Sequence, residues 1–310
     1  MSEYKHIPVL LEETISGLNI KPNGIYVDLT LGRAGHSSEI LKRLNKKGLL
    51  IGVDQDKEAI EESDKRLSQI ASNYKLVKSN FVNFEDILSS LNIDKVDGVL
   101  MDLGVSSPQF DDSERGFSYR YDAPLDMRMD VDQKLTAKEV VNTYPESELR
   151  KIFYEYGEDK YSASIAHNIV KARETKSIET TFELVDIIKR SKPSKELKKV
   201  GHPAKQIFQA LRIEVNNELN VLKETLSQVI NHLNSGGRVA VITFHSLEDK
   251  IVKKLFKDLA VVEGNRNNFP LEEETKDFIL ITRKGIKPSE SELEKNHRSA
   301  SSTLRILEKK

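Results

Sequence analysis

Two features near the start of the chain have the chemistry of a nucleoside-binding site. The segment 30–36 (TLGRAGH) is rich in small residues, which let a backbone approach a ligand closely beside a helix N-terminus. Asp54 follows the next apolar run, where a carboxylate can accept hydrogen bonds from both ribose hydroxyls of nicotinamide cofactors or of S-adenosylmethionine. The structural alternatives are a simple tight turn and a helix cap.

The same turn indicates which ligands do not fit. The dinucleotide pattern G-x-G-x-x-G would need glycine where Ala34 and Ser37 stand, and no phosphate-binding G-x-x-x-x-G-K-[ST] occurs in the chain. The turn therefore predicts a small nucleoside-bearing ligand without a pyrophosphate. Asn80 and Phe81 follow a third apolar run, where the amide would face the edge of an adenine and the phenyl ring its face. A phenylalanine of the core is the alternative.

The strongest local pattern is DLGVSSPQF, at residues 102–110. Enzymes that methylate exocyclic amines of bases carry [DNS]-P-P-[YFW] at the corresponding place, and the segment from Ser107 to Phe110 (SPQF) is an imperfect match. The N4 amine of cytosine is a poor nucleophile because its lone pair is delocalised into the ring. Acceptors near Ser107 would hold that amine, Pro108 would fix the geometry, and Phe110 would stack on an extruded base. The alternative is a proline-containing turn that leaves the sheet.

A basic segment and two histidines complete the candidate residues. Residues 189–205 hold seven lysines and arginines and one acid, Glu196, which suits either phosphate contact or a solvated helix face. His202 and His245 lie near the expected cleft, but no H-x₃-H or H-E-x-x-H spacing accompanies them, so we predict no metal site.

The elements that must position these residues alternate between strand and helix. Apolar runs predict strands at residues 24–31, 48–53, 74–77 and 96–103, with helices at 37–44, 56–70 and 84–91 between them. This alternation predicts a mostly parallel, doubly wound α/β sheet, in which ligands bind beyond the carboxyl ends of the strands. The polar residues named above follow those ends.

The pattern changes near residue 111, after which no convincing strand occurs until residue 201. Two T-x-x-E pairs, Thr136 with Glu139 and Thr180 with Glu183, predict helix starts by capping boxes. We therefore predict a discontinuous α/β domain, 1–111 and 204–310, with an inserted all-helical domain at 112–203. A structureless connection of about 90 residues would be improbable in a compact domain.

After the insertion the sheet is expected to resume. A stripe of apolar residues predicts one long amphipathic helix over residues 208–233, ended by two glycines. An interior strand at 238–244, a helix at 250–256 and an edge strand at 278–283 follow, and the charged tail after residue 284 is weakly specified.

Composition limits the class of protein. The 310 residues suit about two domains, and 38% hydrophobic with 31% charged residues suits a globular protein with a core. No apolar run approaches the ~20 residues of a membrane span and the N-terminus lacks a signal-peptide pattern, so we expect a cytoplasmic protein without membrane contact. The absence of cysteine excludes disulfides, thiolate metal sites and a cysteine nucleophile. A net charge of −1 excludes a uniformly basic surface but allows a local basic face.

Motifs along nearly the whole chain resemble one known family. They are residues 4–11 (YKHIPVLL), 32–36, 102–109, 115–118 (RGFS), 124–129 (PLDMRM), 201–205 (GHPAK), 208–216 (FQALRIEVN) and 242–249 (ITFHSLED). On these motifs the chain resembles the MraW family of bacterial small-subunit ribosomal RNA methyltransferases.

The resemblance implies a fold, a reaction and a set of site residues. The fold is a Rossmann-like, class I S-adenosylmethionine-dependent methyltransferase domain with a helical insertion, expected to contact RNA. The reaction transfers a methyl group from S-adenosylmethionine to N4 of a cytidine in the decoding region of 16S rRNA, with the small ribosomal subunit as partner. The family's cofactor contacts correspond to Ala34, Gly35, His36, Asp54, Phe81, Asp102 and Gln109. We expect catalysis mainly by alignment, and the catalytic candidates are Asp102, Ser107 and Pro108.

Two other functions are compatible with such a fold. A nucleotide-dependent oxidoreductase is disfavoured because the turn lacks the dinucleotide glycines. A non-catalytic RNA-binding or ribosome-assembly factor is disfavoured because the expected cofactor positions are intact.

Overall fold

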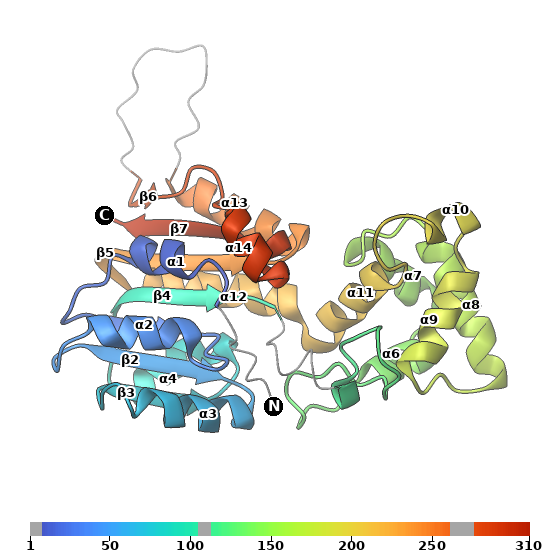
Figure 1. Ribbon diagram of the computed structural model, residues 1–310, viewed down its shortest axis with the longest axis horizontal. Coiled ribbons are helices and arrows are strands. Elements are labelled where there is room, and N and C mark those ends of the chain that lie inside the picture. Colours follow the sequence, from blue (N-terminus) through green and yellow to red (C-terminus); the bar gives the residue numbers. More distant parts are fainter. Residues whose placement is uncertain (1–7, 105–112, 261–275) are drawn as a thin grey trace, which may run out of the picture. The chain divides into compact units, whose positions relative to one another are not determined.

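The computed structural model of the chain describes residues 8–104, 113–260 and 276–310. The chain forms two compact units (Figure 1), here named the α/β unit (Met1–Gly104 with Val221–Lys310) and the helical unit (Val105–Asn220). No helix in the described part of the chain is long and apolar enough to cross a membrane.

A seven-stranded sheet forms the centre of the α/β unit, in the order β3-β2-β1-β4-β5-β7-β6. The first five strands pair in parallel, and β7 is antiparallel to both β5 and β6. The four strands predicted within the first hundred residues are confirmed, and so is the mostly parallel α/β fold. The strands are β1 (Ile25–Asp28), β2 (Leu49–Asp54), β3 (Tyr74–Lys78), β4 (Val96–Asp102), β5 (Leu233–Thr243), β6 (Phe278–Leu280) and β7 (Thr303–Lys309).

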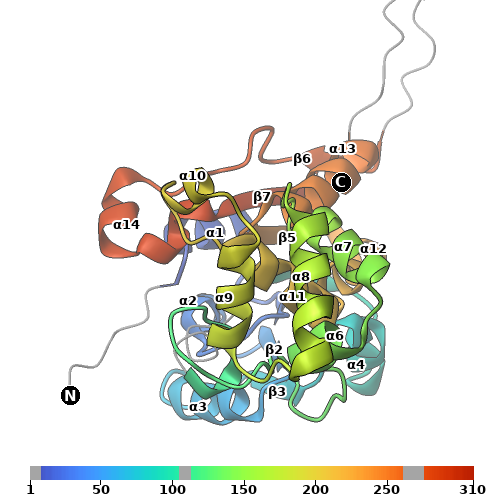
Figure 2. The ribbon, with the colours of Figure 1, turned by 90° about the vertical axis from the view of Figure 1, so that its right-hand side faces the viewer.

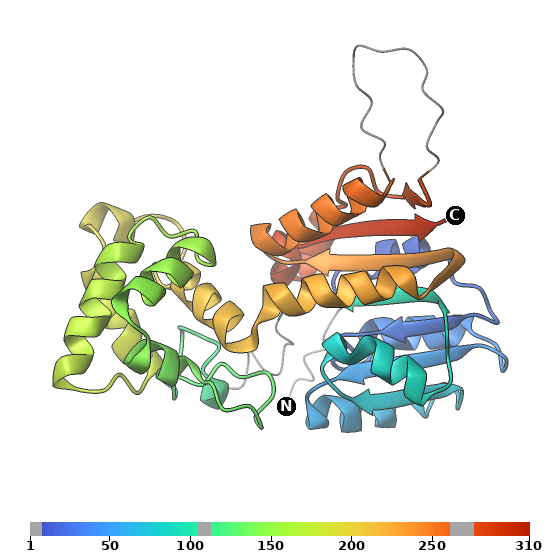
Figure 3. The ribbon, with the colours of Figure 1, turned by 180° about the vertical axis from the view of Figure 1, so that it is seen from behind.

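Helices cover both faces of this sheet (Figures 1 and 3). On one face lie α1 (Leu11–Leu18), α2 (Gly35–Arg43) and α3 (Lys57–Leu67), and on the other α4 (Phe84–Ser90), α12 (Glu218–Asn231) and α13 (Ser246–Ala260). Side chains alternate between the two faces along each strand. Tyr26 and Leu50 therefore pack toward α1–α3, whereas Val27 and Ile51 pack toward α4, α12 and α13. The short segments η1 (Phe81–Asn83), α14 (Glu290–Lys295) and η3 (His297–Ser301) complete the unit.

The helical unit has its own core and contains no strand in residues 113–220 (Figure 2). Capping boxes start α6 at Thr136 and α9 at Thr180, as predicted. The helices are η2 (Ser113–Arg115), α6 (Ala137–Thr143), α7 (Glu146–Glu155), α8 (Ser162–Thr175), α9 (Thr181–Arg190), α10 (Ser194–Leu197) and α11 (Lys205–Asn216). Because α11 packs into this core through Phe208 and Leu211, the compact unit ends later than the boundary predicted at residue 203.

The prediction of one continuous helix over residues 208–233 is wrong. The helix is interrupted between α11 and α12 at Asn217, whose φ of 50° lies in the left-handed region. The apolar stripe continues across the break because each helix buries an apolar face. α11 packs into the core of the helical unit, and α12 packs on the face of the sheet that α4 and α13 also cover. The Arg212 guanidinium holds the Glu218 carboxylate across the break with two hydrogen bonds, of 2.7 and 2.8 Å.

Two strands also differ from expectation. β5 begins at Leu233, before the two glycines, and its register with β4 shifts between Val96 and Gly98. Gly236, with a φ of 70°, lies inside this irregular start rather than at the end of a helix. β7 occupies the tail that the sequence left weakly specified, and it places β6 at the edge of the sheet, as predicted for that strand.

Candidate functional site

The turn between β1 and α2 is fixed by Asp54, at the end of β2. Its Oδ2 atom accepts a hydrogen bond from the Gly32 N–H and its Oδ1 atom one from the Asp56 N–H, both at 2.9 Å. A carboxylate has about four acceptor sites, so Asp54 can still accept a hydrogen bond from a ligand hydroxyl. Burial raises the pKa of Asp54. Asp54 therefore shapes the turn in addition to the ribose-binding role predicted for it.

The small residues of the turn have separate tasks. Gly32 has a φ of 50°, and among the described residues a Cβ added there would meet only the Thr30 carbonyl oxygen, at 3.9 Å. This part of the chain therefore leaves room for a ligand beside the Gly32 backbone. A Cβ on Gly35 would come within 2.4 Å of the Pro8 ring, so glycine is required where α2 begins. Ala34 is fully buried with a φ of 55°, and its methyl group belongs to the core.

Asp28, at the end of β1, belongs to the site although it was not among the predicted residues. Its side chain is 2% exposed, and it accepts hydrogen bonds from the Ser37 hydroxyl at 2.7 Å and the Thr30 N–H at 3.1 Å. Burial raises its pKa to about 6. Asp28 shows the same sequence signal as Asp54, because each is an acid that ends an apolar run.

Asp102 and His36 lie at the same edge of the sheet. The Asp102 N–H donates to the Thr30 hydroxyl (2.6 Å), and Asp102 Oδ2 lies 3.7 Å from His36 Nδ1. His36 Nε2 lies 3.0 Å from the Val9 carbonyl oxygen, so a neutral ring carries its proton there. Burial raises the pKa of Asp102 well above its usual range, and the Asp28 and Glu248 carboxylates raise it further. Its Oδ1 atom is buried without a hydrogen-bond partner among residues 8–104, 113–260 and 276–310.

Phe81 stands beyond β3, beside the end of β2. Asn80 caps this segment by accepting a hydrogen bond from the Val82 N–H (3.0 Å), and its amide donates to the Gln55 side chain (3.3 Å). Phe81 is half-buried against the core below α4. Four neighbouring strands, β3, β2, β1 and β4, end on the same side of the sheet. Phe81, Asp54, His36 and Asp102 therefore lie together at the carboxyl ends of these strands.

Glu248, in the first turn of α13, adds a third carboxyl group at the carboxyl ends of the strands, beside buried Asp28 and partly buried Asp102. It is 2% exposed, and its Oε2 atom accepts a hydrogen bond from the Phe244 N–H (2.8 Å). His245 Nε2 lies 3.0 Å from Glu248 Oε1. The sequence placed His245 near the cleft but did not single out Glu248.

The main electrostatic feature of the site is a group of three carboxyl groups, of which Asp28 and Asp102 have raised pKa values. Asp28, Asp102 and Glu248 follow three neighbouring strands, and the hydrogen-bond donors to Asp28 are neutral groups. Buried carboxylates are unfavourable unless a positive charge balances them. The arrangement therefore favours a nucleoside ligand that carries positive charge, as S-adenosylmethionine does on its sulfonium and ammonium groups.

The remaining predicted residues, Ser107, Pro108 and Gln109, lie outside the described residues, and so does Phe110. Their roles stay predictions.

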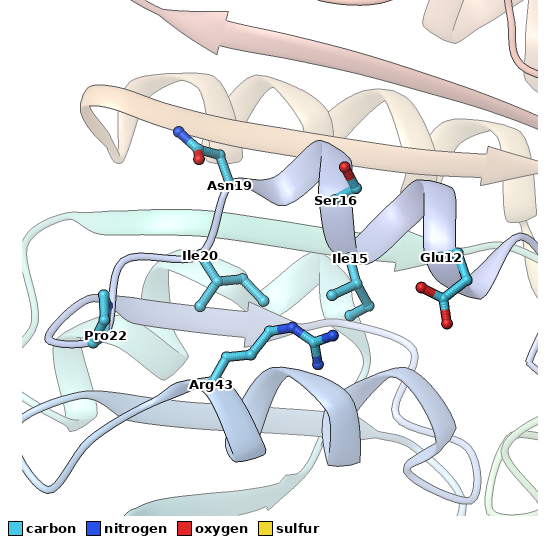
Figure 4. Close-up of a pocket in the computed structure, with 7 residues that line it drawn as sticks. All are labelled: Glu12, Ile15, Ser16, Asn19, Ile20, Pro22 and Arg43. Atoms are coloured by element: carbon cyan, nitrogen blue, oxygen red, sulfur yellow. The ribbon is translucent and has the colours of Figure 1, made fainter.

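A surface pocket at the other end of the sheet is a different feature (Figure 4). It lies beside α1 and the end of α2, before the start of β1, and holds none of the predicted site residues. The guanidinium of Arg43, which lines it, is bound to Glu39 at 2.8 Å. The residues that line the pocket are Glu12, Ile15, Ser16, Asn19, Ile20, Pro22 and Arg43.

The basic segment 189–205 has two kinds of lysine. Lys192 is buried, with its ammonium 2.5 Å from Asp159 Oδ2 and 2.7 Å from the Pro203 carbonyl oxygen, so it anchors the loop rather than facing solvent. Lys199 is exposed and pairs with Glu196 at 2.9 Å. The other basic residues of the segment are exposed.

Comparison with known proteins agrees with this architecture. A family model described as the MraW methylase family matches residues 3–310. Ribosomal RNA small subunit methyltransferase H of Mesoplasma florum is 55% identical over 310 residues, covering 99% of this chain and 99% of that protein. The protein of the same name from Clostridioides difficile is 53% identical, again over 99% of both chains. A solved rRNA methylase from Streptococcus thermophilus is 11% identical, and the match covers 96% of this chain and 92% of that protein. Its TM-score of 0.43 is too low to support an inference.

The fold and the site together define a class of protein. A mostly parallel sheet, a glycine turn after its first strand and buried carboxylates at the neighbouring strand ends are those of a Rossmann-like, class I methyltransferase domain. The chain belongs to the MraW methylase family. The predicted family, fold class and S-adenosylmethionine cofactor are thereby confirmed.

Proposed function

We propose that this protein transfers a methyl group from S-adenosylmethionine to N4 of a cytidine in the decoding region of 16S ribosomal RNA, acting in the cytoplasm. The observation that carries the proposal is the 53–55% identity, over nearly complete chains, to proteins named ribosomal RNA small subunit methyltransferase H. The helical unit is proposed to contact the RNA and the α/β unit to hold the methyl donor.

Residues of the α/β unit fit the methyl donor. The described residues leave room for a ligand beside the Gly32 backbone, and the Asp54 carboxylate would accept hydrogen bonds from the ribose hydroxyls. Residues 34–36 would line the ribose and methionine side, and Phe81 would lie against the adenine. The positive charge of the donor would favour the ionised forms of the Asp28 and Asp102 carboxyl groups, whose pKa values are raised in its absence.

The bound donor supplies an electrophilic methyl group, so the protein's own task is alignment and control of the amine proton. Asp102 and Gln109 would lie between cofactor and base, while Ser107 and Pro108 would orient the N4 amine. Methylation of C5 of cytosine requires a thiolate that attacks the ring, and the chain has no cysteine. An exocyclic amine needs no covalent nucleophile, which supports N4 as the target.

A methyl-transfer assay tests the proposal. Small-subunit particles from a strain that lacks this protein are incubated with the purified protein and methyl-labelled S-adenosylmethionine, and the RNA is digested to nucleosides. The expected product is N4-methylated cytidine. Label in another nucleoside would contradict the assigned amine, and binding of the cofactor without any transfer would favour a non-catalytic RNA-binding factor.

A further inference from the structure

One surface of the helical unit brings exposed aromatic rings next to cationic side chains. The segment around Tyr121 runs beside the start of α9, where the Thr181 hydroxyl donates to the Tyr121 carbonyl oxygen (2.6 Å) and the Phe182 N–H to Asp122 Oδ1 (3.3 Å). Tyr121 is 54% and Phe182 43% exposed. Exposed aromatic rings are more common at binding surfaces than elsewhere on a protein. This surface therefore has the composition of a contact site.

His202, just before α11, is rigidly held beside this segment. Its ring stacks on Tyr119 with 4.3 Å between centroids and 10° between planes, and Tyr119 meets Phe208 edge-on at 5.7 Å. His202 Nδ1 accepts a hydrogen bond from the Ala204 N–H (3.2 Å), so the neutral ring carries its proton on Nε2. Within the described ranges Nε2 has no acceptor of its own. It is a positioned donor available to a ligand.

Three cationic side chains lie close enough to this imidazole to lower its pKa. Burial lowers the pKa of His202, and Lys189, Arg120 and Lys192 lower it further because each disfavours a second positive charge nearby. Lys192 is neutralised by Asp159, whereas Lys189 and Arg120 are exposed and have no carboxylate partner in the part of the chain that the structure describes. A neutral donor thus lies beside two unpaired cations, a combination suited to a phosphate group.

We infer that this surface binds a single-stranded segment of the RNA substrate, an inference that rests on the proposed function in taking RNA as the partner. Arg120 and Lys189 bind backbone phosphates, and His202 Nε2 donates to a phosphate oxygen. Tyr121 and Phe182 stack on bases. The cations favour RNA over an uncharged partner, and an acidic protein is the competing occupant.

Binding of the full-length protein to a deproteinised fragment of small-subunit ribosomal RNA, followed by fluorescence anisotropy over a range of salt, tests this inference. Arg120→Ala with Lys189→Ala should weaken binding about tenfold and reduce the slope of log K against log salt by about 1.4, since each single-strand phosphate contact adds about 0.7. Tyr121→Ala should weaken binding roughly fivefold or more and leave the slope unchanged, because stacking releases no counterions.

Arg150→Ala with Lys151→Ala removes the same two charges from exposed positions on α7 and is the matched control. RNA binding by the Arg120/Lys189 variant that equals the control overturns the inference. Unchanged RNA binding with loss of binding only to intact subunits also overturns it, because that result identifies a protein partner. Methyl transfer by the unaltered protein is measured separately, so a failure of the proposed function appears in that assay and a failure of this inference in the binding assay.

Discussion

At the residue scale, Asp28 is a buried carboxyl group whose charge depends on pH near neutrality. Burial raises its pKa to about 6, whereas an exposed aspartate in an unfolded chain titrates near 3.9. The folded state therefore holds the proton more tightly than the unfolded state. The contribution of Asp28 to stability is complete below about pH 4 and is lost as the pH rises through about 6.

Asp28→Asn should remove this dependence. The amide keeps an acceptor for the Thr30 N–H and carries no charge. The free energy of unfolding of the variant, relative to that of the wild type, should therefore be higher at about pH 7.5 than at about pH 4.5. The increase should approach about 1.4 kcal/mol for each unit by which the pKa of Asp28 differs between the folded and unfolded states. Urea unfolding at both pH values measures the difference, and Asp94→Asn, at an exposed carboxyl group, is the control. An equal stability difference at the two pH values would show that Asp28 does not titrate in this range.

Asp54 combines two functions, and two substitutions separate them. Asp54→Ala removes the acceptors for the Gly32 and Asp56 N–H groups as well as the ribose contact, so S-adenosylmethionine affinity should fall about 10- to 100-fold, the effect of losing charge-assisted hydrogen bonds. Asp54→Asn keeps one oxygen acceptor and should give an intermediate loss. Isothermal titration calorimetry measures both affinities. Unchanged binding by Asp54→Ala would remove this residue from the cofactor site.

At the element scale, the buried pair of Lys192 and Asp159 ties the loop before α11 to the end of α7. The exposed fractions of the two side chains are 6% and 1%, and the ammonium also reaches the Pro203 carbonyl oxygen (2.7 Å). Lys192→Ala should cost about 3–5 kcal/mol of unfolding free energy, because it leaves a buried carboxylate without its partner.

The double variant Lys192→Ala with Asp159→Ala should cost less than the sum of the single changes, because neither charge is then left alone. Urea unfolding of the four proteins gives this double-mutant cycle. An RNA-contact role for Lys192 makes the opposite prediction, a reduced salt dependence of RNA binding with unchanged stability.

Local sequence signals predicted several elements of each unit. The alternation of apolar runs identified β1 to β4, and two T-x-x-E pairs identified the starts of α6 and α9, because these signals act within a few residues. β7 was missed since its stability depends on distant partners: it pairs with β5 on one side and β6 on the other. The interruption of the helix at Asn217 was missed for a similar reason. The spacing of the apolar residues is the same on both sides of Asn217 and does not show that α11 and α12 pack into different cores.

The site was predicted in part. Asp54 was identified from its place after a strand and from the glycine turn, whereas His36 and Asp102 were assigned to the cofactor through the family resemblance. The structure brings all three to the carboxyl ends of the strands. Glu248 was missed because it lies on a helix after β5, where an acid is an ordinary N-terminal residue of a helix. Only the packing of α13 shows that this carboxylate is buried and raises the pKa of Asp102.

At the scale of the whole molecule, separate cores imply separate responses to the cofactor. The α/β unit packs around its sheet and the helical unit around α6–α9 and α11, and all described residues proposed to bind S-adenosylmethionine belong to the α/β unit. A ligand stabilises the folded unit that binds it, by about 2.7 kcal/mol at a concentration 100 times its dissociation constant.

Scanning calorimetry should therefore resolve a transition that S-adenosylmethionine raises by roughly 5–10 °C and another that it leaves in place. The shift should be lost in Asp54→Ala at the same cofactor concentration, whereas Arg120→Ala with Lys189→Ala should retain it, because those side chains belong to the helical unit. A single transition that shifts as a whole would mean that the two cores unfold together. The RNA-contact variants would then have to be checked for lost stability before their weaker binding is assigned to missing phosphate contacts.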